Sequence, residues 1–205
     1  MNPIYPSLAA LAVLIIFGVL VGRQNRDLLR ISAYREFLWR LTPILSTAVF
    51  VGGLPFIMRQ TNIYNASTVL MVYLIGAAVL TIIISRGVAP EERKASRAFQ
   101  NKDYDTAVKL YENLISHRPL PRYHSALAAS RDAAGEDPHA ALESAEEAIK
   151  LDPKLGIAFY NRASAFAATG EKARARGDLQ TVFRVDSSRS LRRAAAEALE
   201  SLEKI

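Results

Sequence analysis

Three long stretches without a charged side chain dominate the first 86 residues. They run from Ile4 to Gly22, from Leu41 to Met58 and from Ser67 to Ser85. About 20 apolar residues in a helix are enough to cross the hydrocarbon core of a bilayer. We therefore predict an all-α membrane domain over residues 1–86, with transmembrane helices at about 4–22, 41–58 and 67–85. The middle stretch contains proline and glycine, which membrane helices tolerate, and a re-entrant middle segment with only two crossings is the alternative.

Charge divides the chain at the same place. Residues 1–86 contain seven arginines, no lysine and two acids, whereas residues 87–205 contain 19 basic and 18 acidic residues. The net charge of +6 therefore comes from the apolar part rather than from a folded basic surface, which disfavours a nucleic-acid partner. The absence of cysteine excludes disulfides, thiolate-bound metals and thiol catalysis.

The positions of the arginines predict the orientation in the membrane. A basic segment follows the first apolar stretch, a second begins at Arg86, and Arg59 alone lies between the second and third stretches. Basic loops stay on the cytoplasmic side, so three crossings place the N-terminus outside and the C-terminal half on the cytoplasmic side. We expect a bacterial inner membrane or a photosynthetic membrane. Since basic residues follow the first stretch, we interpret it as an uncleaved anchor and not a signal peptide.

The segment 24–40 interleaves apolar residues with arginines, a pattern typical of an amphipathic helix that lies in the membrane interface. Its predicted interfacial anchors are Arg23, Arg26, Arg30, Arg35, Trp39 and Arg40. A docking surface for a partner subunit is the alternative interpretation.

Pairs of small residues four apart predict where the membrane helices pack closely. These pairs are Gly18 with Gly22 and Ala48 with Gly52, and such spacing lets helix backbones approach each other. The three apolar stretches contain no acidic, basic or histidine side chain. Ion pathways and proton relays need such groups, which disfavours a transporter or a channel.

A period of 34 residues organises the C-terminal half. Ala107, Ala141 and Ala175 are spaced by 34, as are Pro119, Pro153 and Ser187. A helical hairpin of this length cannot bury its apolar face alone and must stack on its neighbours. We predict a solenoid over residues 87–205, with repeats at about 88–121, 122–155 and 156–187. Residues 188–205 are predicted to form a capping helix that buries Leu191, Ala195, Ala198 and Leu202.

This half of the chain resembles the tetratricopeptide repeat (TPR) family, and the third copy carries the closest match through Phe159, Ala163, Phe166, Gly170 and Ala175. The resemblance covers about 115 of 205 residues. It implies a groove lined by the first helix of each hairpin, in which a partner peptide binds. The groove positions carried over from the family are Glu92, Ser96 and Phe99, then Arg122, Ser125 and Asp132, then Ile157, Tyr160 and Ser164, together with Ala89, Ala129 and Ala167.

Asn161 matches a family position that often holds the backbone of a ligand. The branch of the family that binds C-terminal carboxylates uses basic residues where Glu92 and Tyr160 stand here, so the resemblance disfavours that ligand. The chain's own end helix is an alternative occupant of the groove.

The sequence shows no pattern of a catalytic site. It contains no nucleophile–base pair, no glycine-rich phosphate loop and no spaced set of metal-ligating side chains. We therefore predict no catalytic residue, no cofactor and no metal, and we expect that the protein is not an enzyme.

Together these features predict a non-catalytic protein-binding scaffold at a membrane. A linker of about four residues near Gly87 keeps the repeats close to the membrane surface. The expected role is an assembly factor or accessory subunit of a photosynthetic or respiratory membrane complex. Its expected partners are other proteins of that complex, or a peptide segment, and the lipid bilayer. A cytochrome c maturation-type TPR membrane protein, a small transporter or channel with a regulatory TPR domain, and a self-oligomer are the alternatives.

Overall fold

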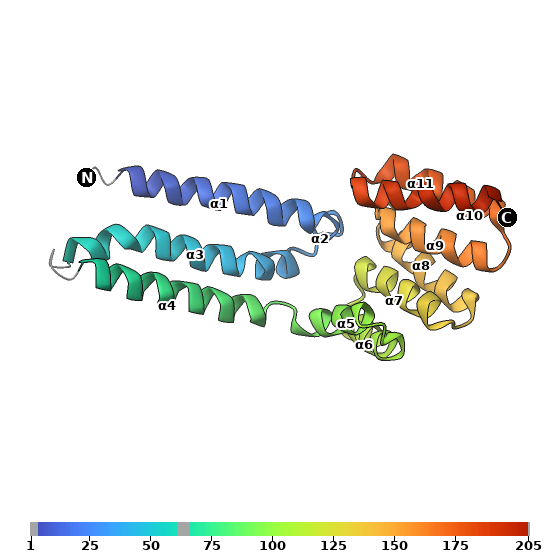
Figure 1. Ribbon diagram of the computed structural model, residues 1–205, viewed down its shortest axis with the longest axis horizontal. Helices are drawn as coiled ribbons and strands as arrows, with labels where there is room; N and C mark the ends of the chain where they lie inside the picture. The colour runs from blue at the N-terminus through green and yellow to red at the C-terminus, as the bar shows by residue number, and fades with distance from the viewer. Residues whose placement is uncertain (1–3, 61–65, 205) are drawn as a thin grey trace. The chain divides into compact units, whose positions relative to one another are not determined.

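The computed structural model describes residues 4–60 and 66–204, and every regular element in this part of the chain is an α-helix. The helices separate into two compact units, Met1–Pro90 (unit 1) and Glu91–Ile205 (unit 2). Figure 1 labels the helices of both units in chain order.

Unit 1 consists of long helices joined by short turns. Its elements are α1 (Ile4–Gln24), α2 (Arg26–Arg30), α3 (Tyr34–Gln60) and α4 (Ala66–Gly87). Helix α3 packs against α1 on one side and against α4 on the other, as Figure 1 shows. Neighbouring long helices are antiparallel, so the end of α1, all of α2, the start of α3 and the end of α4 lie at one end of the unit.

Two helices of the described part are long and apolar enough to cross a membrane, by length and composition: Tyr34–Leu54 within α3 and Thr68–Gly87 within α4. Their large apolar side chains face outward, and Val49 is 72% exposed. The apolar stretch 4–22 lies in α1, where most side chains before Ile15 are outside the described residues. These features are weak evidence for membrane anchoring.

The structure divides the segment 24–40 instead of forming one amphipathic helix. Asn25 follows α1, and its side-chain Nδ2 donates a hydrogen bond to the Val21 carbonyl at 2.9 Å. Ser32 then adopts a left-handed backbone with φ of 59°, and the Ala33 amide donates to the Leu28 carbonyl at 2.8 Å. This tight turn separates α2 from α3, so residues 34–40 belong to the long helix α3.

Hydroxyl groups support helix α3 near Pro43 and Gly53. Pro43 has no N–H to donate to the Trp39 carbonyl, and the Thr42 hydroxyl donates to that carbonyl at 2.7 Å. On the facing side, the Tyr73 hydroxyl of α4 donates to the Phe50 carbonyl at 2.7 Å. A Cβ at Gly53 would lie 3.0 Å from the same hydroxyl, so glycine makes room for this contact.

The predicted packing positions do not coincide with this close contact. A Cβ built at Gly18, Gly22 or Gly52 would meet no atom within 4 Å, and Ala48 is half-buried. The close helix packing predicted at these positions stays a prediction.

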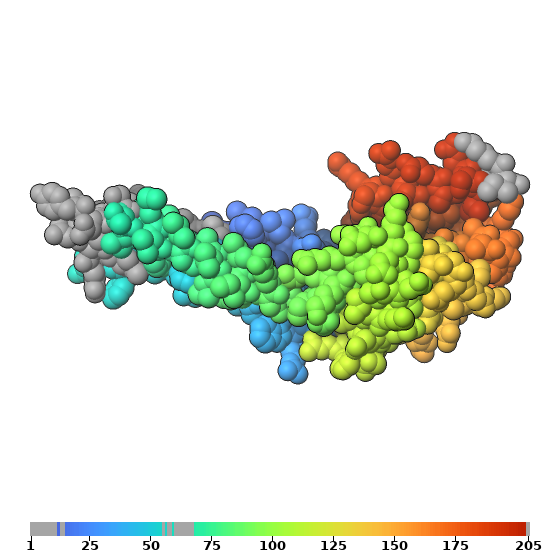
Figure 2. All heavy atoms as spheres, turned by 60° about the horizontal axis from the view of Figure 1, so that its bottom comes forward, coloured from blue at the N-terminus to red at the C-terminus, as the bar shows by residue number. Residues whose placement is uncertain are grey.

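Unit 2 is a series of helical hairpins. They are α5 (Pro90–Gln100) with α6 (Tyr104–His117), α7 (Pro121–Ala134) with α8 (Pro138–Leu151), and α9 (Gly156–Ala168) with α10 (Lys172–Val185), followed by α11 (Arg189–Lys204). Sequential helices from α6 to α11 pack against each other, and α7 also contacts α9. In Figure 2 the colours of this unit follow one another from light green through yellow and orange to red.

Local sequence signals set the helix boundaries of unit 2. The Asp103 carboxylate accepts a hydrogen bond from the Thr106 amide at 3.3 Å, and Asp137 accepts one from the His139 amide at 3.0 Å. Both are N-cap bonds that satisfy free amides at a helix start. Gly135 ends α7 in a left-handed conformation with φ of 74°, which costs glycine little.

Small side chains form the contacts between hairpins. Ala107, Ala141 and Ala175 are at most 1% exposed, so the predicted packing role of the 34-residue period is confirmed. Close approach also explains Gly156 at the start of α9, where a Cβ would lie only 2.5 Å from the Asp186 Cβ.

Helix α11 closes the end of the array. Ala195 is fully buried in a core cluster with Phe166, Leu179 and Val182, and Leu191, Ala198 and Leu202 pack against the same cluster. Its neighbours are α10 and α9, so this helix covers the apolar end of the last hairpin.

Candidate partner-binding surface

The predicted groove residues lie on the first helices of the three hairpins, a set that we call the first-helix face, except Ala89, which directly precedes α5. Helix α5 carries Glu92, Ser96 and Phe99, helix α7 carries Arg122, Ser125 and Asp132, and helix α9 carries Ile157, Tyr160, Asn161 and Ser164. The structure connects neighbouring first helices through several of these side chains.

Glu92 connects α5 to α7. Its Oε2 accepts a hydrogen bond from the Tyr123 hydroxyl at 2.9 Å, and its Oε1 lies 3.5 Å from Nη1 of Arg122. Burial, and secondarily the negative charge of Glu92, raises the pKa of Tyr111 on α6 to about 12. The carboxylate therefore stands where the first hairpin meets the second.

Asn161 connects α7 to α9. Its Nδ2 donates to the Ser125 carbonyl at 2.7 Å and lies 3.0 Å from the Ser125 hydroxyl. Both residues are buried, so here the amide holds a neighbouring helix. Its predicted use in holding a ligand backbone stays a prediction.

A second connection between α7 and α9 lies at the surface. The Ser164 hydroxyl donates to Oδ2 of Asp132 at 2.7 Å, in an exposed position. On α9, Ile157 is 39% exposed, whereas Tyr160 is half-buried and packs against the core cluster. On α5, Ser96 is half-buried, and the half-buried Phe99 makes an edge contact with Tyr104 at a centroid distance of 5.5 Å. The accessible part of the face thus combines apolar and polar groups.

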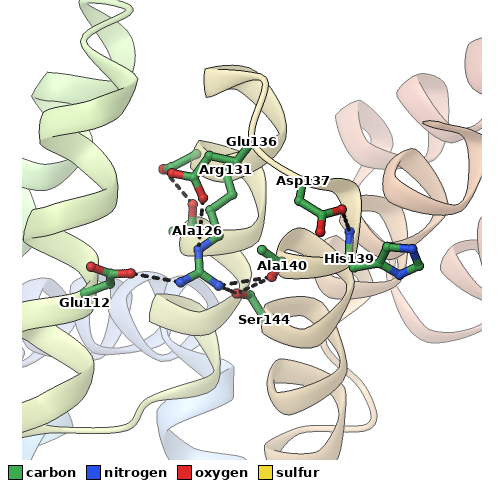
Figure 3. A network of polar contacts seen from close by, with 9 residues as sticks. Glu112, Ala126, Arg131, Glu136, Asp137, His139, Ala140 and Ser144 are labelled. Carbon is green, nitrogen blue, oxygen red and sulfur yellow. Dashed lines mark hydrogen bonds and ion pairs between the residues drawn. The ribbon is translucent and has the colours of Figure 1, made fainter. Parts of the chain in front are cut away.

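Arg131 forms a network that sequence reasoning missed (Figure 3). Its Nη2 donates to Glu112 of α6 at 2.8 Å, and its Nη1 donates to the Ala140 carbonyl at 3.1 Å and to the Ser144 hydroxyl at 2.9 Å, both on α8. Glu136 also lies 3.5 Å from its Nε. One half-buried guanidinium on α7 thus holds α6 and α8 together.

A second arginine performs the same role in the last hairpin. Arg162 of α9 makes a bidentate pair with Asp178 of α10, at 2.7 and 2.8 Å, and its guanidinium lies 5.6 and 5.7 Å from the rings of Phe159 and Phe166. The hydrogen bond to Asp178 raises the pKa of Arg162 further. In the sequence, Arg162 stands out as the one arginine within a helix of small and apolar residues. This pattern does not identify Asp178 as its partner.

The polar groups of this surface serve mainly to join helices. Among the residues that the structure describes, no group of three or more histidine and acidic side chains is placed to hold a metal ion. The ion pairs and hydrogen bonds described above join helices to one another. Those of Glu92, Asn161 and Ser164 join α5 to α7 and α7 to α9.

No protein-family model and no curated protein matches this chain. Solved structures do resemble it. A structure of the Yersinia enterocolitica type III secretion translocator chaperone SycD aligns with a TM-score of 0.52 and 21% identity, covering 62% of this chain and 92% of SycD. An alternative dimer of SycD aligns with a TM-score of 0.52 and 23% identity, covering 56% and 89%. At these identities the likeness shows the fold, which is a TPR-like array of helical hairpins.

Proposed function

We propose that this protein is a non-catalytic scaffold that binds another polypeptide on the first-helix face of unit 2. The observation that carries the proposal is the TPR-like stack of hairpins, whose first helices are joined by the Glu92–Tyr123, Ser125–Asn161 and Asp132–Ser164 hydrogen bonds. A continuous face of this kind is how helical solenoids present an extended binding surface. SycD, which shares the fold, is a chaperone for a secretion translocator, which supports a polypeptide as the ligand.

We further propose that residues 1–86 form a transmembrane domain and that residues 87–205 form the repeat domain on the cytoplasmic side. Support comes from the apolar, outward-facing α3 and α4. Further support comes from the arginines that gather around α2, where α1 ends and α3 begins, because basic loops stay on the cytoplasmic side. Helix α4 ends at Gly87 and α5 begins at Pro90, so a partner must come close to the membrane. The function that follows is an assembly factor or accessory subunit of a multi-subunit photosynthetic or respiratory membrane complex.

The direct test is recovery of the tagged full-length protein in mild detergent, followed by native electrophoresis and mass spectrometry. Ile157→Arg puts a charge on the first-helix face, and Gln180→Arg puts the same charge on an exposed position of α10. We expect that I157R loses the partner and that Q180R keeps it. Equal recovery of the same partners by both variants, or no partner for the wild-type protein, would contradict the proposal.

The stoichiometry of that recovery separates the two roles. A fixed ratio with one mature membrane complex would identify a resident subunit, and a low ratio with immature subunits would identify an assembly factor. Protease treatment of intact spheroplasts tests the orientation, because a cytoplasmic repeat domain is protected until the membrane is permeabilised.

A further inference from the structure

A hollow between α3 and α4 is unrelated to the first-helix face. It has a volume of about 420 Å³, and Thr47, Phe50, Leu54, Tyr73, Ala78 and Ile82 are among its lining residues. Leu74 and Ile82, which also line it, are more than half exposed, so the hollow opens to the side of the unit. Its lining is mostly carbon, and a hollow with few polar partners holds water poorly.

The hollow is elongated and has one polar end. Its lining spans residues 47–54 on α3 and 73–82 on α4, which at about 1.5 Å per residue corresponds to roughly 10–14 Å along the helices. At one end the Thr81 hydroxyl lies 3.5 Å from the hydroxyls of Ser46 and Thr47. Towards the other end, the Tyr73 hydroxyl is bound to the Phe50 carbonyl, which leaves apolar surface around it.

Two arginines lie beyond the hydroxyl end of the hollow, one on each of the helices that line it. Arg86 follows Ile82 by four residues and Ala78 by eight, and Arg40 precedes Thr47 by seven. Residues at these spacings lie on the same side of a helix. Arg59 lies near the opposite end of α3, five residues beyond Leu54, and is therefore far along the helix from the hydroxyl end of the hollow.

We propose that this hollow binds an acyl chain of an anionic phospholipid, with the lipid phosphate at the Arg40 and Arg86 end. The inference rests on the proposed membrane placement of α3 and α4. An apolar slot that is open to the bilayer accepts a hydrocarbon chain, and basic residues at the end of membrane helices attract anionic headgroups. Arg40 also contacts the protein itself, but a guanidinium has five N–H donors and can bind a phosphate as well.

The test is native mass spectrometry of the detergent-purified full-length protein, titrated with phosphatidylglycerol or with phosphatidylcholine of the same acyl chains. We expect bound phosphatidylglycerol in clear excess over phosphatidylcholine. Arg40→Gln and Arg86→Gln should each weaken phosphatidylglycerol binding by about fivefold, and together by about 30-fold, from the usual contribution of one basic residue near a lipid surface. Arg59→Gln is the matched control and should leave the affinity unchanged.

The hollow itself is tested by Ala78→Phe, which fills it, against Val79→Phe, which adds the same ring next to it. A78F should abolish binding of both lipids at this site and V79F should not. Equal binding of the two lipids, an effect of R59Q equal to that of R40Q, or full binding by A78F would each overturn the proposal. If A78F does not fold, the arginine variants decide alone.

Extraction of native membranes at alkaline pH separates this inference from the function on which it rests. Release of the wild-type protein from the membrane would overturn the proposed membrane placement and the lipid site together. Retention in the membrane, combined with equal binding of the two lipids, would overturn only the lipid site. A dimer that A78F dissociates would assign the hollow to a second copy of the chain and would also overturn it.

Discussion

The two units of this protein are both built from helices but treat their apolar side chains in opposite ways. In unit 1, large side chains such as Val49, Phe56 and Ile75 face outward. In unit 2, alanines such as Ala141 and Ala175 are buried between hairpins. Burial away from water stabilises a soluble solenoid, whereas helices in lipid gain little from burying apolar groups against each other. The difference lies in the direction of the apolar surface, which turns outward in unit 1 and inward in unit 2, as the proposed membrane placement of unit 1 requires.

The polar contacts differ in the same sense. Along α3 and α4 of unit 1, hydroxyl groups bond to carbonyls, as Thr42 does with Trp39 and Tyr73 with Phe50. In unit 2, the guanidinium groups of Arg131 and Arg162 join one helix to the next. Ionised groups in the centre of a bilayer are costly, so the charged pairs of unit 2 agree with the proposed placement of that unit outside the membrane.

The largest expected effect comes from placing charge on the outward face of unit 1. Ile75→Asp combined with Val79→Asp should disfavour membrane insertion by about 3 kcal/mol for each aspartate. The measurement is the fraction of full-length protein that stays in membranes after alkaline extraction. Ile157→Asp with Gln180→Asp adds the same charge to exposed positions of unit 2 and should not change this fraction. An equal decrease of the membrane-retained fraction for both double variants would contradict the difference between the two units.

A somewhat smaller effect is expected from the ion pair in the last hairpin. Asp178 is only 7% exposed, and Asp178→Ala leaves the Arg162 guanidinium without its bidentate partner. We expect a loss of about 3 kcal/mol in the free energy of unfolding of unit 2, measured by denaturant titration of the full chain with circular dichroism. Glu171→Ala removes a pair with Arg174 that is largely exposed and should change stability little. A stable D178A variant would show that the pair does not hold the hairpin.

A larger side chain can be placed at a buried and at an exposed alanine of the same helix, α10. Ala175→Leu inserts a larger side chain between buried helices and should destabilise unit 2 by about 2 kcal/mol. Ala173→Leu, two residues earlier and exposed, should be nearly neutral. Thermal unfolding of the two full-length variants measures the difference. Similar melting temperatures would mean that the contacts between hairpins are looser than described here.

The smallest expected effect is on the pH dependence of unit 2. Burial lowers the pKa of His124 on α7, and the Glu147 charge partly opposes the shift. The unfolded chain therefore binds this proton more readily, so stability is present above the ordinary histidine pKa and is lost as pH falls through and below it. His124→Gln should reduce the loss of melting temperature between pH 7.5 and 5.5. His117→Gln, at an exposed position, is the control, and an equal slope for both variants would contradict the assignment.

Much of unit 2 was predictable because residues that recur at the repeat period occupy equivalent packing positions in successive hairpins. The spacing of Ala107, Ala141 and Ala175 indicated the buried contacts from the sequence alone, and the apolar face of α11 was equally readable. The partners of Arg131 and Arg162 were not, because they depend on how neighbouring helices pack in space. Asp178, for example, lies 16 residues after Arg162.

Unit 1 shows the limits of composition. The apolar stretches indicated long helices. The apolar period of residues 24–40 continues through Ser32, so nothing in that pattern indicated the left-handed turn there. The hollow between α3 and α4 depends on which faces of the two helices meet, and a charge-free sequence does not specify that. The residues of the first-helix face could be predicted from a family pattern. The burial of Ser125 and Asn161 between helices could be seen only in the structure.

The most direct test of partner binding on the first-helix face is site-specific photocrosslinking in living cells. A photoreactive residue is placed at Ile157 on the first-helix face or at Glu143 on an exposed position of α8, and the adducts are identified by mass spectrometry. We predict that position 157 crosslinks to one membrane-associated protein and that position 143 does not. Identical adducts from both positions, or no protein adduct from position 157, would contradict it.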